Sequence, residues 1–386
     1  MIRHVRASKL FFVIVIFLFV FSEYTTRIDA LDGIFNVLEA LKVKYIALMF
    51  ATIYNMLKCP LIIQGEKAKD FKLLLVPSAV FFVCTIAIQI SNCVFNINAY
   101  IEILYMVVPL VYSYSVILIS GERIDEYINC IFGVIFLWTI LRYARDFTIS
   151  NILSINYLKS YSPFENNLAF VTVFLLAFYI NRNQKRMAII LLILNVLFMK
   201  RFCLVAAVIL FVFRAFFRNC KEINSKYVWI FTGLVLMVPM VFEAILSPWM
   251  DSFLKSKEIN LYLLTMGRNQ RWDIVLNGEY TMFGLGSCKE ALSNYYHHQG
   301  SNYKSLYYDL HNDVLRIYIE TTIVGLGCFV WCYLKYASEN LMTMFLMLYI
   351  IGDMCFNHFL GGGNVIMWIS IYLVMHYISQ EGTQEE

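Results

Sequence analysis

Residues 228–242 read VWIFTGLVLMVPMVF and contain no charged side chain. This run, and the run IILLILNVLF at 189–198, are typical of helices in a lipid bilayer, where the backbone polar groups must be hydrogen-bonded within the segment. Strands of a transmembrane barrel would show short segments of alternating hydrophobicity instead. Both runs therefore predict membrane-spanning α-helices.

The composition extends this prediction to the whole chain of 386 residues, of which 60% are hydrophobic, 17% aromatic and only 15% charged. Its mean hydropathy is +0.66. A soluble globule could not cover such a surface with polar groups. We therefore expect an all-α polytopic membrane protein that forms a single domain, 1–386. The ten cysteines form no CxxC pair and lie mostly in or beside apolar runs, which indicates buried thiols rather than a disulfide or zinc framework.

About twelve apolar windows are long enough to cross a bilayer if tilt and polar ends are allowed for. They are 9–24, 43–63, 71–91, 101–120, 126–142, 166–181, 187–200, 202–218, 227–247, 313–335, 340–360 and 363–380. The polar stretch 249–312 lies between the ninth and tenth windows. We expect it to form one large external, periplasmic loop.

Positive charge in the short loops predicts the orientation, because such charge accumulates on the cytoplasmic side. With twelve spans, one side carries Arg3, Arg6, Lys9, Lys58, Lys67, Lys69, Lys72, Arg182, Lys185, Arg186, Arg214, Arg218, Lys221 and Lys226. This bias predicts that both termini are cytoplasmic and that the long polar loop is outside.

A second group of cations falls on the outer side, where membrane insertion does not require positive charge. Its members are Lys200, Arg201, Arg268, Arg271 and Arg316. Arginine forks bind phosphate oxygens bidentately and remain charged when partly desolvated. A histidine, His311, follows in the same loop and has the chemistry of a general base at neutral pH. For each cation alone, a solvated or headgroup-facing side chain is the alternative.

Several short motifs share this outer placement. They are Gly267-Arg268 followed by Trp272, the turn Phe283-Gly284-Leu285-Gly286, and His311-Asn312 leading into a helix with Glu320 and Gly325. In their order and spacing they resemble the signature region of the O-antigen ligase and polymerase superfamily. The pair Lys200-Arg201, which opens an earlier helix, is similar to the basic pair of many O-antigen polymerases.

The resemblance implies an inverting, metal-independent glycosyltransferase of the bacterial inner membrane that needs no cofactor. Its donor is a glycan linked to undecaprenyl diphosphate. It implies that Arg268 and Arg201 hold the diphosphate and that His311 is the base that activates the acceptor hydroxyl. The substrate-binding candidates that accompany them are Lys200, Arg271, Asn312, Asp313 and Glu320. Arg271 is not fixed by the family pattern. Asn312, Asp313 and Glu320 are expected to orient the histidine or the sugar.

Three functions remain open at this level. The first is a polymerase that adds the growing glycan to an incoming lipid-linked repeat unit, and the pair Lys200-Arg201 favours it. The second is a ligase that transfers finished glycan to a lipid A core. The third is a flippase, which would need charges at the membrane midplane and two related halves. The expected partners are the lipid-linked oligosaccharide, membrane lipid and a separate chain-length regulator, with no nucleic acid.

Two other classes of chemistry are disfavoured. The chain contains no GxxxxGK[ST] loop and no DxD pair in a predicted cytoplasmic loop, which argues against ATP hydrolysis and nucleotide-sugar transfer. The adjacent His297 and His298 lack a third ligand at a familiar spacing, so no metal site is predicted.

Overall fold

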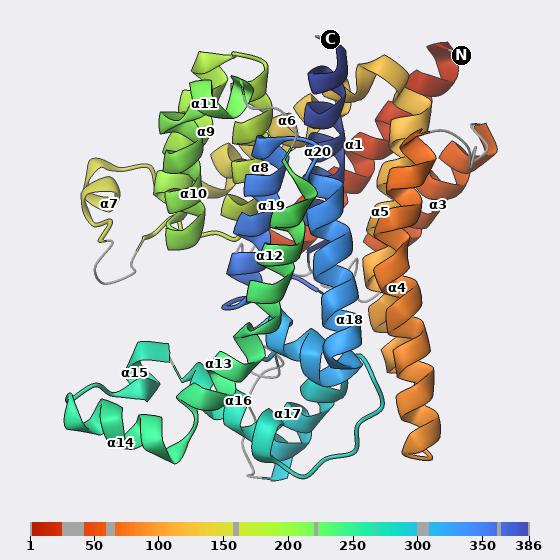
Figure 1. Ribbon diagram of the computed structural model, residues 1–386. Coiled ribbons are helices and arrows are strands. Elements are labelled where there is room, and N and C mark those ends of the chain that lie inside the picture. The colour runs from red at the N-terminus through yellow and green to blue at the C-terminus, as the bar shows by residue number, and fades with distance from the viewer. Residues whose placement is uncertain are drawn as a thin grey trace.

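The computed structural model describes residues 2–24, 42–58, 66–156, 162–219, 223–265, 267–298, 309–360 and 364–384. Helices are the only regular structure in these ranges, which contain no β-strand. Both termini lie at one end of the helical bundle, and α14 (Pro248–Ser256) and α17 (Ser287–His298) lie at the opposite end (Figure 1). Of the predicted loop 249–312, residues 266 and 299–308 lie outside the described ranges.

Helices occupy part of all twelve predicted windows. Those of the bundle are α1 (Ile2–Tyr24), α3 (Val43–Lys58), α4 (Glu66–Ser91), α5 (Asn98–Ser120), α6 (Ile124–Tyr143), α8 (Leu168–Asn181), α9 (Lys185–Phe198), α10 (Arg201–Val212), α11 (Arg214–Asn219), α12 (Ser225–Leu236), α13 (Val238–Ile245), α18 (Asp313–Ala337), α19 (Leu341–Met354) and α20 (Val365–Gln384). Four described helical stretches are long and apolar enough to cross a membrane: Ala68–Ser91, Asn98–Tyr143, Ser225–Ile245 and Asp313–Ala337.

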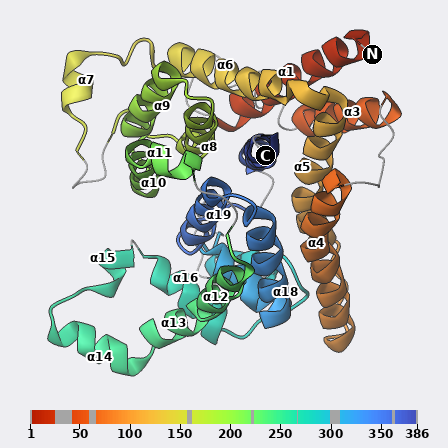
Figure 2. The ribbon, with the colours of Figure 1, turned by 45° about the horizontal axis from the view of Figure 1, so that its top comes forward.

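Helices α8 and α20 form the centre of the bundle. Every residue from Leu168 to Ile180 is buried, and α20 packs against α5, α6 and α8. Figure 2 shows α20 nearly end-on between these neighbours. A helix that is apolar on all sides requires such a central place. On the outside, α3, α9 and α12 expose large apolar side chains, among them Phe50, Ile193 and Trp229. Lipid is the natural solvent for these faces.

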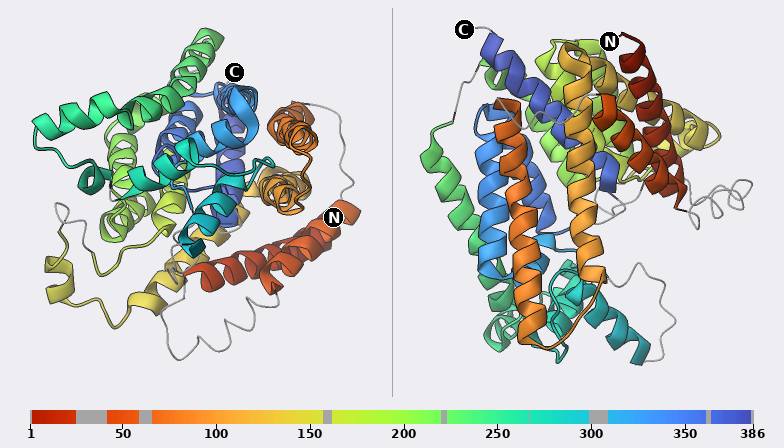
Figure 3. Two further views of the ribbon diagram at one scale, coloured as in Figure 1. Left: turned by 90° about the horizontal axis from the view of Figure 1, so that it is seen from below. Right: turned by 90° about the vertical axis from the view of Figure 1, so that its right-hand side faces the viewer.

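The end of the bundle opposite the termini is built on α4 and α18, which pack along each other and are seen side by side in the right-hand view of Figure 3. Helix α18 is not continuous, because Thr322 has φ 67° and ψ 179°. The break separates residues 313–321, which carry several charged groups, from the apolar segment 323–337. The charged first part of α18 is therefore set apart from the part suited to lipid.

The polar stretch has a small hydrophobic core of its own. Phe242 of α13 meets Trp272 of α16 (Arg268–Asn277) edge to face, with ring centroids 4.6 Å apart. Leu292 of α17 and Leu315 of α18 are fully buried in the same cluster. This core fixes α16 and α17 against the start of α18. Trp272, singled out in the sequence by its motif, has a packing role here.

Two predicted boundaries need adjustment. The eleventh window, 340–360, is helical only to Met354, and residues 355–360 form the connection towards α20. The window 202–218 contains two helices, α10 and α11, with a turn at Phe213. Both differences arise because hydropathy measures the apolar character of a segment and does not register where the backbone turns.

Candidate functional site

Helix α18 begins with a capped N-terminus. The side-chain oxygen of Asn312 accepts a hydrogen bond from the Leu315 amide at 2.9 Å, which satisfies one of the free amides of a helix start. Asn312 and the next residue, Asp313, are completely buried. Within the described part of the chain, Nδ2 of Asn312 has no hydrogen-bond partner.

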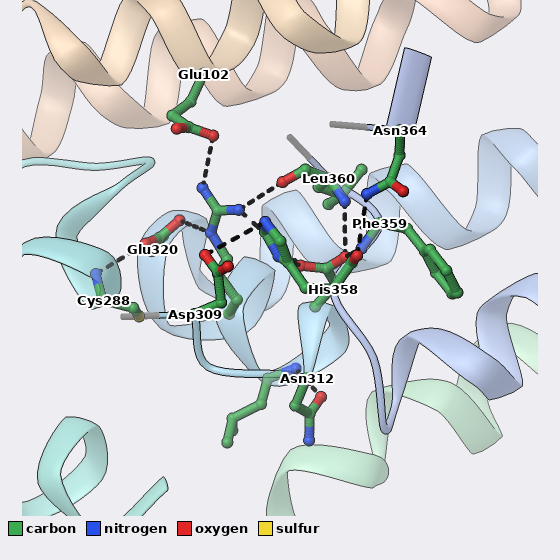
Figure 4. Close-up of polar contacts among 12 residues, drawn as sticks. Glu102, Cys288, Asp309, Asn312, Glu320, His358, Phe359, Leu360 and Asn364 are labelled. Atoms are coloured by element: carbon green, nitrogen blue, oxygen red, sulfur yellow. Dashed lines mark hydrogen bonds and ion pairs between the residues drawn. The ribbon is translucent and has the colours of Figure 1, made fainter. Parts of the chain in front are cut away.

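Asp313 ties this helix start to the connection between α19 and α20. Its Oδ1 lies 2.8 Å from Nδ1 of His358, and its Oδ2 accepts the amides of Phe359 and Leu360. Figure 4 shows His358, Phe359 and Leu360 gathered beside the start of α18. The other ring nitrogen, Nε2 of His358, lies 3.7 Å from Asp309. The His358 side chain retains 19% exposure, so one edge of the imidazole is accessible.

Burial and the nearby carboxylate of Asp313 shift the pKa of His358 in opposite directions. Burial by itself lowers the pKa, but the Asp313 carboxylate outweighs burial, and the pKa of His358 is raised above its ordinary value. A carboxylate that accepts from one ring nitrogen fixes the tautomer and stabilises the imidazolium. His358 is therefore placed to accept a proton on its second nitrogen.

Arg316, one turn further along α18, is surrounded by acceptors. Its Nε donates to Glu320 and its Nη2 donates to Glu102 of α5, both at 3.0 Å, and its Nη1 donates to the carbonyl of Leu360 at 2.7 Å. The sequence suggests that an outer cation binds an external anion. For Arg316 the protein supplies the anions itself.

Glu320 completes this buried network. Its Oε1 accepts the amide of Cys288, in the first turn of α17, at 2.9 Å. Helix N-termini favour negative charge because of their free amides and their dipole. Since Glu320 is fully buried and occupied by Arg316 and Cys288, its oxygens serve the junction of α17 and α18. Its part in orienting the histidine or the sugar stays a prediction.

Arg268 and Arg271 connect α16 to both histidine-bearing segments. Nη1 of Arg271 donates to the carbonyl of Asp309, two residues before His311, at 3.0 Å. Nη1 of Arg268 donates to the carbonyl of Phe356, two residues before His358, at 2.5 Å. One turn of α16 therefore brings two guanidinium groups to the two segments that carry the histidines.

His311 lies among these cations. It has φ 51°, a left-handed conformation that few residues other than glycine adopt. Burial, followed by the charges of Arg271 and Arg268, lowers its pKa to about 4. The His311 imidazole is consequently neutral at pH 7 and a weak base. A weak base is poorly suited to activate the acceptor hydroxyl, which is the role that the resemblance implies for His311.

An acidic side chain lies on the other side of Arg268. Burial and the charge of Arg271 lower the pKa of Arg268, and the carboxylate of Asp353 in α19 opposes them. Asp353 is buried; its Oδ1 accepts from Asn357 at 2.5 Å, and its Oδ2 has no hydrogen-bond partner in the described ranges. Lys200, whose Nζ pairs with Glu165 at 2.7 Å, is also within electrostatic range of Asp353.

The predicted site residues are thus largely brought together. Arg268, Arg271 and His311 share one neighbourhood, and Asn312, Asp313 and Glu320 line the buried junction beneath it. Lys200 borders this region through Asp353. Arg201 is exposed on the first turn of α10 and is not among the strongest charges acting on His311. The glycine turn packs against α4, where Gly284 lies against Thr85, and the backbone of Gly286 hydrogen-bonds the Glu320 carboxylate.

His358, Glu102 and Asp309 are the members of the site that sequence reasoning misses. His358 follows an apolar helix and precedes another, so hydropathy includes it in a span. The available signal is its position three residues before the glycine run 361–363, whose sequence predicts a turn. Asn357 and His358 are polar residues at a point where a spanning helix would be apolar.

The sequence matches no protein-family model and no curated protein. The function is therefore inferred from the residues and their geometry. Among the described residues, no group of three or more histidine, cysteine or acidic side chains is arranged to hold a metal ion.

Proposed function

We propose that this protein is a polysaccharide polymerase of the bacterial inner membrane. It transfers a growing glycan from undecaprenyl diphosphate to the sugar at the end of an incoming lipid-linked repeat unit. The reaction takes place at the outer end of the bundle. About twelve spanning helices, cytoplasmic termini and a periplasmic loop at 249–312 belong to the same proposal.

One observation carries the proposal. Arg268 and Arg271, on successive positions of one helix face, are hydrogen-bonded to the segments of His358 and His311, respectively. The reaction needs fixed positive charge for a diphosphate leaving group and a base for the acceptor hydroxyl. Helix α16, which carries both arginines, lies at the end of the bundle opposite the termini (Figure 1), and its hydrogen bonds to the two histidine-bearing segments support this assignment.

The roles follow from the chemistry of the groups. The two guanidinium groups bind the oxygens of the diphosphate, and Lys200 assists by offsetting the charge of the neighbouring Asp353 carboxylate. Each well-formed contact to a charged group contributes on the order of 1.5–3 kcal/mol. Asn312, Asp313 and Glu320 are proposed to position the α18 start rather than to touch the sugar. Arg201, on the exposed first turn of α10, is proposed to make a further contact to the diphosphate of the donor.

The proposal is tested by glycan length on a gel. A strain of the source organism that lacks this gene is complemented with wild type, with Arg268→Gln or with the control Lys289→Gln, an exposed change on α17. Wild type and the control should restore a ladder, and Arg268→Gln should leave single-repeat products at matched membrane abundance. If wild type changes only attachment to the lipid A core, the protein is a ligase; if it changes only export of the repeat unit, it is a flippase.

A further inference from the structure

We infer that His358, held by the buried carboxylate of Asp313, is the group that takes the proton from the acceptor hydroxyl. This inference rests on the proposed function and assigns the base within it. The sequence motif points to His311 for this role, and the geometry points to the other histidine of the same site.

The contacts of His358 carry the argument. Its Nδ1 is 2.8 Å from Oδ1 of Asp313, and its main-chain carbonyl accepts from Asn364 at 3.1 Å. The Asp313 carboxylate is itself fixed by the amides of Phe359 and Leu360. A ring held in this way on one nitrogen presents the other nitrogen in a constant direction. Preorganised placement of this kind is what proton transfer requires.

The charges around His358 also suit the role. From α18 it is faced by Asp313 and Arg316, and from the segment before α18 by Asp309 and His311. The carboxylates of Asp313 and Asp309 favour the imidazolium that forms when His358 takes the proton. His311, by contrast, is surrounded by the guanidinium groups of Arg271 and Arg268, which oppose protonation.

The step balances as a single displacement. The acceptor O–H gives its proton to Nε2 of His358 as the oxygen attacks the anomeric carbon of the donor glycan. The new C–O bond forms while the bond from the anomeric carbon to the diphosphate oxygen breaks. Undecaprenyl diphosphate leaves with the electron pair, next to Arg268 and Arg271. The imidazolium, stabilised by Asp313, returns its proton to solvent before the next turnover.

A purely structural role for His358 makes a different prediction, and one variant separates the two. In His358→Asn, the amide NH₂ occupies nearly the position of Nδ1 and can still donate to Asp313, but nothing replaces Nε2. If His358 only ties the α19–α20 connection to α18, this variant should behave like wild type. If Nε2 is the base, kcat/KM should fall by about 10²–10⁴-fold with the KM for the donor little changed.

The experiment uses full-length protein in lipid nanodiscs and lipid-linked repeat units extracted from the source strain lacking the gene. Release of undecaprenyl diphosphate is measured for wild type, His358→Asn and the control His298→Asn, an exposed histidine of α17. The control should match wild type. A loss in His358→Asn of about 10²-fold or more, in protein that elutes like wild type and is folded at the assay temperature, supports the inference. Activity within a few-fold of wild type overturns it.

The pH profile of wild type gives a second reading that does not depend on folding of the variant. Because kcat/KM reports the free enzyme, its acid limb should lie above about 6.5, the ordinary histidine value. A limb near 4, where the pKa of His311 lies, would assign the base to His311 and overturn the inference. If folded wild type releases no undecaprenyl diphosphate at any pH, the proposed function itself fails and the inference falls with it.

Discussion

Nη2 of Arg316 lies 3.0 Å from Oε2 of Glu102, although 214 residues separate them in the chain. The pair joins α18 to α5 at the end of the bundle opposite the termini, and only 5% of the Arg316 side chain is exposed. The same guanidinium holds Glu320 and the carbonyl of Leu360. Arg316 therefore connects α5, the start of α18 and the segment of His358.

Removing this cation should destabilise the protein strongly. Arg316→Met keeps the length of the side chain but leaves Glu320 buried without its charge partner, and breaking a buried pair in this way costs about 3–5 kcal/mol. Glu102→Gln should cost less, because an amide oxygen still accepts from Arg316 and the Glu320 pair persists. Melting temperature in detergent, followed by size exclusion, measures both. An equal or larger loss in Glu102→Gln would contradict this account of the network.

The glycine at 284 should be intolerant of any side chain. Gly284 has φ 99°, and a Cβ there would lie 2.6 Å from Oγ1 and 2.9 Å from Cα of Thr85. Gly284→Ala should therefore move the turn away from α4 and lower the melting temperature. Thr85→Ala should rescue it only in part, because the backbone contact remains. Gly233→Ala, in a helix with nothing within 4 Å, is the matched control and should be neutral or slightly stabilising.

The helices could be predicted from sequence, whereas their interruptions could not. Apolar runs alone are enough to predict the helical stretch Ser225–Ile245, because lipid-facing and buried positions are both apolar. The break at Thr322 and the early end of α19 at Met354 lie inside apolar runs and leave no mark in the hydropathy pattern. The end of α19 at Met354 places His358 in the connection to α20, whereas hydropathy predicts that it lies in a membrane span.

Arg268 should contribute the planar geometry of its guanidinium group as well as its positive charge. Arg268→Lys retains the charge but cannot hold two phosphate oxygens at once. We expect kcat/KM for the lipid-linked donor to fall by roughly 10–100-fold, the loss of about one charged contact. Donor titrations of the nanodisc protein check this, with Lys289→Gln as the control. Wild-type donor kinetics in Arg268→Lys would exclude a bidentate contact.

Stability should depend on pH through His358. Burial lowers its pKa and Asp313 raises it, with a net rise. A group whose pKa is raised on folding stabilises the folded state fully below its unfolded value, about 6.5, and loses that contribution as pH rises through the folded value. The advantage of wild type over His358→Asn in melting temperature should therefore shrink as pH is raised from about 6 to about 9. A constant or growing advantage would mean that Asp313 does not hold an imidazolium.

The site shows a similar limit of sequence reasoning. Arg268, Arg271 and His311 could be found because they stand out as polar residues in a polar loop of an apolar chain. The importance of Asp313 could also be suspected, but not its partner. That partner, His358, is 45 residues away along the chain, and only the packing of α18 against the α19–α20 connection brings the two together.

The most direct test of the central claim is chain growth by the purified protein. Nanodisc-embedded wild type is given lipid-linked repeat units alone, and the lipid-linked products are separated by size while undecaprenyl diphosphate is counted. We expect a ladder of longer lipid-linked glycans, with one undecaprenyl diphosphate released for each linkage formed. Folded protein that leaves the repeat units unextended, or that acts only when lipid A core is added, would contradict the polymerase assignment.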